Sequence, residues 1–272
     1  MNITSLQMYQ MQPFKTDKPA FKSSRRVVYN GNEILYRTTT EFFRDDLNWS
    51  YLPIFLENHF KGIPKINVYD YGCSSGEEAV SLAIMLIKKL EILADKYFPI
   101  IAKDLDIENI MRAKTGLFLA DKIEHSTLSA VTSPNSEKFY TETPVTLSTS
   151  SKEYANFMRQ NGFMIQFTDL IRKKIKFSQQ DIMQDLQNIK AENTVLLCRN
   201  FWPYLSKISQ LELMSQLSKK FEGTKSLLIL GDYDVDSQND YVRKLLYQYH
   251  FRETILSNVF ERKQKPKEYY NC

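Results

Sequence analysis

Polar residues follow or end four consecutive predicted strands of this sequence, and side chains of these types could bind a ligand. The turn at residues 72–77, Gly-Cys-Ser-Ser-Gly-Glu, follows the first strand, and Asp104 ends the second. Asp181 ends the third, and the pair Arg199-Asn200 follows the fourth. Because the carboxyl ends of parallel strands share one edge of a sheet, these side chains are expected to gather around a ligand there.

The turn at 72–77 brings two glycines next to Glu77 and Glu78, which stand in the first turn of a predicted helix. Gly72 and Gly76 are spaced Gly-x-x-x-Gly, which is neither the G-x-G-x-x-G dinucleotide motif nor a P-loop. An acidic first turn would repel a pyrophosphate and suits a cation, such as an ammonium or a sulfonium. Each feature also has an ordinary explanation, since glycines serve turns and acidic residues favour helix N-termini.

The carboxylates at the second and third strand ends suit an adenosine. Asp104 is placed to accept both ribose hydroxyls, although Asp104 or Asp106 would serve equally as a helix N-cap. Asp181 likewise fits either a helix cap or the adenine amino group. The Arg199-Asn200 pair has no obvious role in a core. With a cation at the glycine turn, the sum is an adenosine with a cationic attachment, which describes S-adenosylmethionine.

Hydrophobic periodicity alternates between strand and helix from residue 66 onward. Upstream, residues 38–60 predict a helix start near Thr40, which stands before an acidic first turn, and a second helix after Pro53. The segment 249–263 predicts two strands with no helix between them. The other strands are predicted at 66–72, 98–104, 171–181, 193–200 and 225–232, and the other helices at 76–93, 108–119 and 208–221.

This alternation predicts an α/β fold with a doubly wound, mostly parallel sheet covered on both faces. The last two strands predict an antiparallel edge at the C-terminal end. The polar and basic residues 1–35 are expected to form a loose arm with room for one short helix, and 265–272 a basic tail. Between them, 36–264 is expected to be one domain, with a Ser/Thr-rich, aperiodic excursion at about 120–165.

Composition restricts the class of protein. With 43% hydrophobic and 25% charged residues, the chain is typical of a globular protein. Its three cysteines and three histidines are scattered, which argues against a disulfide framework or a metal site and favours a reducing compartment. Without a secretory signal or an apolar stretch of about 20 residues, a cytoplasmic location without membrane insertion is expected. The net charge of +4 is spread along the chain, which disfavours nucleic acid as a partner.

Four motifs in order resemble those of the chemotaxis-receptor glutamate methyltransferases, the CheR family. They are Thr40-Glu-Phe-Phe-Arg44, Gly72-Cys-Ser-Ser-Gly-Glu-Glu78, Asp104-Leu-Asp106 and Cys198-Arg-Asn-Phe-Trp-Pro-Tyr204. The resemblance runs from about residue 36 to about residue 264. It implies a class I methyltransferase, Rossmann-like fold that binds S-adenosylmethionine and releases S-adenosylhomocysteine.

The resemblance also implies a role for each matching position. Arg199 and Asn200 would lie near the transferred methyl group, in contact with the cofactor, and Tyr204 beside the incoming substrate, so these three are the candidate catalytic residues. Thr40 and Arg44 would contact the cofactor from the preceding helix. The remaining cofactor-binding positions are Gly72 and Gly76 in the turn, Glu77 for the methionine amine, Asp104 for the ribose, and Asp181 with Ile182 for the adenine.

Several positions depart from the family's pattern. Thr38, two residues before the matched Thr40, replaces an Asn and is kept as a candidate cofactor contact. Lys114 and Phe118, the candidate substrate contacts besides Tyr204, replace an Arg and a Tyr. Lysine for arginine is not neutral, because an ammonium cannot make a bidentate contact with a carboxylate. The sequence GDYDVDS at 231–237 replaces a His-Ser-Glu version, and the N-terminal region is shorter than the family's helical domain.

The expected reaction is methyl transfer to a glutamate of a protein, with a chemoreceptor as the candidate acceptor, to give a carboxyl methyl ester. A glutamate with a pKa of about 4.3 is already ionised near pH 7, so no general base is needed. This fits a sequence with no histidine near any motif. Two alternatives stay open: a CheR-fold methyltransferase that acts on another protein or a small molecule, and a non-catalytic module that senses the cofactor or binds a partner.

Overall fold

The computed structural model describes residues 24–29, 32–37, 40–144, 146–147, 162–235 and 240–264. The chain divides into two compact units. Among the described residues, the first unit comprises 46–72 and 180–264, and the second comprises the part up to residue 45 together with 73–179. Thr38, most of the predicted arm and the predicted basic tail lie outside the described residues.

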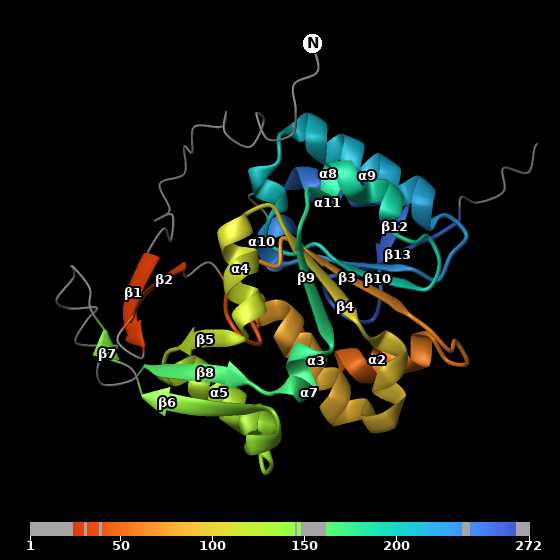
Figure 1. The fold of residues 1–272 in the computed structure, drawn as a ribbon. Helices are drawn as coiled ribbons and strands as arrows, with labels where there is room; N and C mark the ends of the chain where they lie inside the picture. The colour runs from red at the N-terminus through yellow and green to blue at the C-terminus, as the bar shows by residue number, and fades with distance from the viewer. Residues whose placement is uncertain are drawn as a thin grey trace, which may run out of the picture. The chain divides into compact units, whose positions relative to one another are not determined.

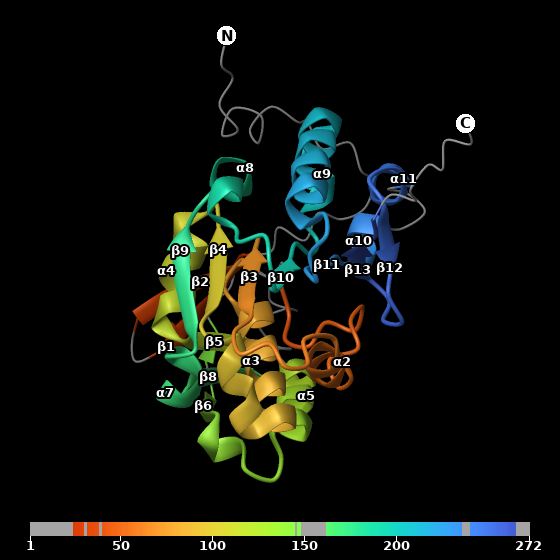
Figure 2. The same ribbon diagram turned by 90° about the vertical axis from the view of Figure 1, so that its right-hand side faces the viewer.

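Seven strands form the main sheet. They are β3 (Asn67–Tyr71), β4 (Ile100–Asp104), β9 (Ile175–Gln179), β10 (Thr194–Leu197), β11 (Leu227–Ile229), β12 (Phe251–Glu253) and β13 (Val259–Arg262). Figure 1 shows this sheet, and its order is β12-β13-β11-β10-β3-β4-β9, which can be followed by the labels in Figure 2. β10 is parallel to β3 and β11, and β4 to β9, whereas β13 is antiparallel to β11 and β12. The predicted mostly parallel sheet with an antiparallel C-terminal edge is therefore confirmed.

The first unit holds β3, β10, β11, β12 and β13. Its helices are α2 (Leu52–His59), α8 (Ile182–Asp185), α9 (Lys207–Phe221), α10 (Asp232–Val235) and α11 (Asp240–Gln248), with 3-10 turns η3 (Leu186–Asn188) and η4 (Trp202–Tyr204). β10 is buried along its whole length, as a continuous apolar run predicts for a parallel strand. Ser206 is the N-cap of α9, and its hydroxyl accepts the N–H of Ser209 at 3.1 Å. α11 packs beside β12 (Figure 2).

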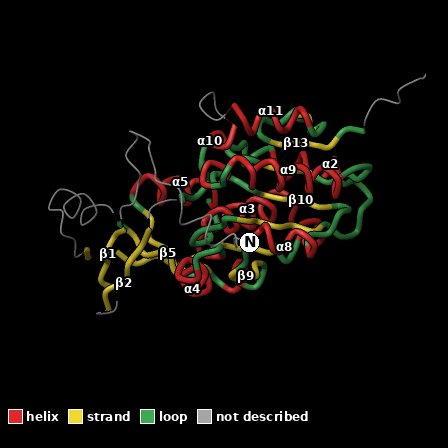
Figure 3. The backbone as a smooth tube through the Cα atoms, turned by 90° about the horizontal axis from the view of Figure 1, so that it is seen from above, coloured by secondary structure: helices red, strands yellow, loops and turns green. Residues whose placement is uncertain are grey.

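The second unit holds β4 and β9 with helices α3 (Glu77–Leu90), α4 (Ile107–Thr115), α5 (Lys122–Thr132) and α7 (Asp169–Arg172), and 3-10 turns η1 (Glu91–Tyr97) and η2 (Ser136–Lys138). It adds an antiparallel sheet of order β5-β8-β6, formed by β5 (Leu117–Ala120), β8 (Phe163–Phe167) and β6 (Tyr140–Pro144). A hairpin of β1 (Ser24–Tyr29) and β2 (Asn32–Arg37), seen as paired yellow strands in Figure 3, extends through β1 to β7 (Thr146–Leu147).

Two sequence-based predictions about the first sixty residues are wrong. Residues 41–50 form turns where a helix was expected to start at Thr40, and the first described helix is α2. Phe43 has a left-handed φ of 51°, which an α-helix cannot accommodate, and its N–H binds Ser81 Oγ at 3.0 Å instead. The described part of the expected arm is the β1–β2 hairpin rather than a loose segment.

The segment after α4 also differs from expectation. Gly116, with φ 66°, ends α4 at Thr115, so the predicted helix 108–119 continues as strand β5. The supposedly aperiodic excursion contains α5, whose N-terminus has a capping box between Asp121 and Glu124. No helix in the described part of the chain is long and apolar enough to cross a membrane.

Candidate functional site

The turn before α3 is tightly wound and leads directly into the helix. Cys73 N–H binds the carbonyl of Lys103 at 3.1 Å, and Gly76 N–H binds the carbonyl of Cys73 at 2.9 Å. Gly76 is the N-cap of α3 with φ 100°. A Cβ there would lie 2.9 Å from the ring of Phe177, so the turn requires glycine for both backbone and space.

Glu77, the first residue of α3, is a buried carboxylate. Only 6% of the residue is exposed, and Ser75 Oγ lies 3.0 and 2.9 Å from its two carboxylate oxygens. Burial raises the pKa of Glu77 to about 8, because removal from water disfavours the charged form. Its own backbone N–H, Ser75 and, more weakly, Arg44 act in the opposite direction. An approaching cation would restore the charged form.

Asp104, at the end of β4, accepts two backbone N–H groups. Ser74 N–H binds Oδ2 and Asp106 N–H binds Oδ1, both at 2.8 Å. Burial raises the pKa of Asp104, while these hydrogen bonds and one from Asn109 lower it. The N-cap of α4 is Asp106, which accepts the N–H of Glu108 at 2.9 Å. Asp104 therefore leaves the capping role to Asp106, and beside its three hydrogen bonds it has one further lone pair for a hydroxyl donor.

The remaining candidates of the second unit differ in exposure. Thr40 and Arg44 are half-buried, and Lys114 is exposed. Phe118 is only 2% exposed, and its ring lies 5.4 Å from that of Phe42 between centroids. Phe118 also packs 5.2 Å from the ring of Phe167, so it belongs to an aromatic core and offers little surface to a substrate.

In the first unit, Asp181 does serve as the N-cap of α8. Its Oδ1 accepts the N–H of Met183 at 2.9 Å. Its Oδ2 is buried and has no hydrogen-bond partner among the described residues. A buried carboxylate oxygen without a donor is costly, so this atom is suited to an amino group of a ligand. Capping and ligand binding are thus compatible here, and the neighbouring Ile182 is buried.

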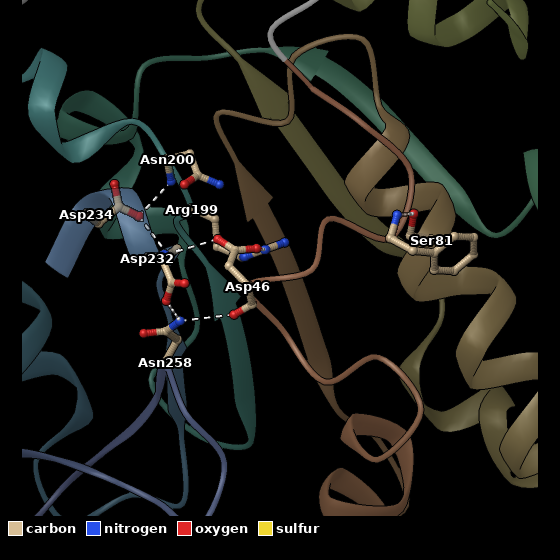
Figure 4. A network of polar contacts seen from close by, with 9 residues as sticks. Asp46, Ser81, Arg199, Asn200, Asp232, Asp234 and Asn258 are labelled. Atoms are coloured by element: carbon tan, nitrogen blue, oxygen red, sulfur yellow. Dashed lines mark hydrogen bonds and ion pairs between the residues drawn. The ribbon is translucent and has the colours of Figure 1, made fainter. Parts of the chain in front are cut away.

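Arg199 has a partner that the sequence alone did not reveal. Its side chain is fully buried and forms an ion pair with Asp46. The guanidinium carbon also lies 5.4 Å from the centroid of the Trp49 ring. Asp46 Oδ2 in turn accepts the N–H of Asp232 at 3.0 Å, and Asn258 donates to the Asp46 carbonyl at 3.0 Å (Figure 4).

Asn200 follows with a left-handed φ of 60° and is half-buried. Its N–H donates to Oδ2 of Asp234 at 2.6 Å (Figure 4). Asp234 is fully buried, and burial raises its pKa to about 7 against the opposing effect of its hydrogen bonds. Tyr204, in η4, is 39% exposed. Asp46 and Asp234 were not among the candidate site residues from the sequence, because the Arg199 partner of Asp46 and the Asn200 and Trp202 partners of Asp234 lie far away in the chain.

A sequence model described as "CheR methyltransferase, SAM binding domain" matches residues 38–140 and 128–251. The chain belongs to this family. A chemotaxis protein methyltransferase of Borreliella burgdorferi is 23% identical over 197 residues, 70% of this chain and 62% of that protein. Chemotaxis protein methyltransferase 2 of Vibrio cholerae is 26% identical over 147 residues, 53% of this chain and 43% of that protein. The chain thus spans less than two thirds of the length of either relative.

Other similarities run over larger shares of the chain. A chemotaxis protein methyltransferase of Listeria monocytogenes is 23% identical over 220 residues, 79% of this chain and 72% of that protein. MNMC2 from Aquifex aeolicus, known from a crystal structure, is 15% identical to this chain with a TM-score of 0.41. The similarity covers 91% of this chain and 72% of the MNMC2 chain. Magnesium protoporphyrin IX methyltransferase from Synechocystis, solved with bound SAM, has a TM-score of 0.37 at 14% identity, over 75% of this chain and 67% of its own.

Proposed function

We propose that this CheR-family chain binds S-adenosylmethionine and transfers its methyl group to a glutamate carboxylate of a protein, with a chemoreceptor as the candidate acceptor. One observation carries the proposal: adjacent serines of the turn before α3 each hold a carboxylate. Ser74 N–H binds Asp104, and Ser75 Oγ binds Glu77. One turn thereby holds two carboxylates, and a nucleoside with a cationic attachment would use Glu77 for its cation and Asp104 for its hydroxyls.

The charge of these groups matches the proposed cofactor. Glu77, with its pKa raised by burial, would hold the methionine ammonium, because an adjacent positive charge offsets the cost of its burial. Asp104 would accept the ribose hydroxyls at the lone pair that Ser74, Asp106 and Asn109 leave unused. In the first unit, the unpartnered Oδ2 of Asp181 would accept the adenine amino group. Cofactor roles for Thr38, Thr40, Arg44 and Ile182 remain part of the proposal.

The bound cofactor supplies an electrophilic sulfonium methyl group. An acceptor carboxylate is already ionised near pH 7, so one of its oxygens can form the new C–O bond while the C–S electron pair moves to sulfur. No proton has to move. The chain's contribution would be orientation and exclusion of water, which can lower a barrier by about 7–11 kcal/mol. Asn200 and Tyr204 would orient the reacting groups, and Lys114 would attract an anionic acceptor.

The test is a methyl-transfer assay with tritiated cofactor and the cytoplasmic domain of a chemoreceptor. We expect label that mild base releases as volatile methanol, since methyl esters hydrolyse and N-methyl groups do not. Glu77→Gln should abolish the label, while the exposed-surface variant Asp240→Asn should not. Label that survives base treatment would show that the methyl acceptor is not a carboxylate. Cofactor binding without transfer to any protein or small-molecule acceptor would favour a sensing module, and no binding would refute the proposal. A cytoplasmic location is part of it, because that receptor domain must be accessible.

A further inference from the structure

A single buried carboxylate joins the two loops that follow β10 and β11. Asp234, in α10, is fully buried. Its Oδ2 accepts the N–H groups of Asn200 at 2.6 Å and Gly231 at 2.8 Å, and its Oδ1 accepts the N–H of Trp202 at 3.1 Å. Because β10 and β11 are adjacent parallel strands, one side chain fixes the backbone of both loops at the same end of the sheet.

The second loop also leaves space for the Asn200 side chain. A Cβ added to Gly231 would lie 2.7 Å from Asn200 Cγ and 2.8 Å from its Nδ2. The amide of Asn200 therefore rests directly against the backbone of Gly231. Its backbone is in the left-handed region, at φ 60°, which asparagine tolerates better than most residues, and its N–H is held there by the bond to Asp234.

We propose that Asp234 is a positioning residue, which fixes Asn200 in the orientation that the cofactor and the transferred methyl group require. The inference rests on the proposed function, in which Asn200 contacts the cofactor. It assigns the orientation of Asn200 to a group that itself touches neither cofactor nor substrate. Gly231 completes the arrangement by leaving room for the amide.

The geometry explains why a carboxylate is needed at this position. Three N–H donors converge on the two oxygens of Asp234, and the ionised carboxylate can accept from all three without donating. An asparagine at 234 would turn an NH₂ group toward at least one of these donors, and the loop would have to move. The positive group that faces the carboxylate is the guanidinium of Arg199, whose own position is set by its ion pair with Asp46.

The first experiment needs no cofactor. In ¹H–¹⁵N spectra of the ligand-free protein, the Asn200 amide should be shifted downfield and exchange slowly with solvent, because it donates a short bond to a buried carboxylate. Asp234→Asn should move this signal upfield and speed its exchange. Gly231→Ala should instead move the side-chain amide signals of Asn200. An Asn200 amide that exchanges rapidly in the unaltered protein would overturn the inference.

The second experiment is a double-mutant cycle on S-adenosylhomocysteine affinity, measured by calorimetry. Asn200→Ala and Asp234→Asn should each weaken binding by about fivefold or more. In the Asn200→Ala background, Asp234→Asn should cost less than about twofold, because the contact that it positions is already gone. A structural role alone would give the same loss in both backgrounds, and that result would refute the inference.

Controls separate this inference from folding defects and from the proposed function. Asp240→Asn removes an exposed carboxylate that pairs with Lys244 and should leave affinity unchanged. Both tryptophans of the chain contact the network around Arg199 and Asp234: Trp49 lies against Arg199, and the Trp202 N–H binds Asp234. An unchanged tryptophan fluorescence spectrum therefore shows that this part of a variant is folded. If Asp234→Asn alone unfolds, Gly231→Ala carries the same cycle. An unaltered protein that fails to bind S-adenosylhomocysteine would refute the proposed function, and the spectra would still decide the positioning of Asn200.

Discussion

The affinity for S-adenosylhomocysteine should rise steeply with pH up to about 7, and Glu77→Gln should abolish this rise. Burial raises the pKa of Glu77 to about 8 in the ligand-free protein. The folded protein therefore holds a proton there that it must release before the carboxylate can bind the ligand's ammonium. Ligand binding is thus linked to deprotonation, and affinity is lost as pH falls.

The size of the effect follows from the pKa. A carboxyl group with a pKa of about 8 is ionised to about 1% at pH 6 and about 9% at pH 7. Affinity should increase about ninefold over that single pH unit, with release of about 0.9 proton per ligand bound at pH 7. The ligand's α-amino group, with a pKa of about 7.7–8.0, stays charged over this range. The interval from pH 6 to pH 7 therefore isolates Glu77.

Calorimetric titrations at pH 6.0, 6.5 and 7.0, each in two buffers of different ionisation enthalpy, measure both quantities. Glu77→Gln should bind more weakly, with a flat pH dependence and no proton release. Asp104→Asn should also bind more weakly but keep the slope, because Asp104 would bind neutral hydroxyls. A slope that survives in Glu77→Gln, or wild-type binding without proton release, would refute the assignment of the ammonium to Glu77.

Three further predictions concern stability. Gly76→Ala should lower the free energy of unfolding, measured in urea, by about 2 kcal/mol or more. A φ of 100° strains any other residue, and the new Cβ would lie against the ring of Phe177 in β9. An unchanged urea midpoint would contradict this. Asp46→Ala should lower the free energy of unfolding by about 3–5 kcal/mol, because it removes the carboxylate of a buried ion pair and leaves the Arg199 guanidinium in place. The double variant with Arg199→Met should recover part of the loss, and additive losses would argue against the ion pair. Without ligand, the melting temperature should fall as the pH rises from about 4 to about 8, because folded Glu77, Asp234 and Asp104 retain protons that the unfolded chain has released. Glu77→Gln/Asp234→Asn should make this dependence weaker in calorimetric scans.

Much of the fold could be predicted because its signals are local. Short apolar runs in the sequence predict the buried strands. Apolar residues at helical spacing after a glycine turn predict the helix that begins at Glu77. The same pattern predicted polar residues at the strand ends, and Asp104 and Glu77 do bind adjacent serines of one turn. The helix expected from Thr40 failed because a tertiary bond from Phe43 to Ser81 overrides local propensity.

The rest of the candidate site depends on long-range partners. Nothing near Arg199 in the sequence indicates that Asp46 neutralises it, and this ion pair gives Arg199 the structural role that the sequence did not suggest. Phe118 matched a substrate position of the family, but its ring is packed among aromatic side chains from other segments. The role of Asp234 depends on the fold, because only the fold brings the loops after β10 and β11 to the same carboxylate.

The Asp46 network also sets an order of events during synthesis. Arg199 follows Asp46 by 153 residues in the chain, and Asn258 follows it by 212 residues. Both partners are therefore synthesised long after Asp46. At about 5–20 residues per second, the ribosome needs roughly 8–30 s to deliver Arg199 alone. The chain of the second unit from residue 73 to 179 emerges within that interval, so it can begin to fold while Asp46 is still exposed as an unpaired carboxylate. The first unit closes only after its last strand has left the ribosome.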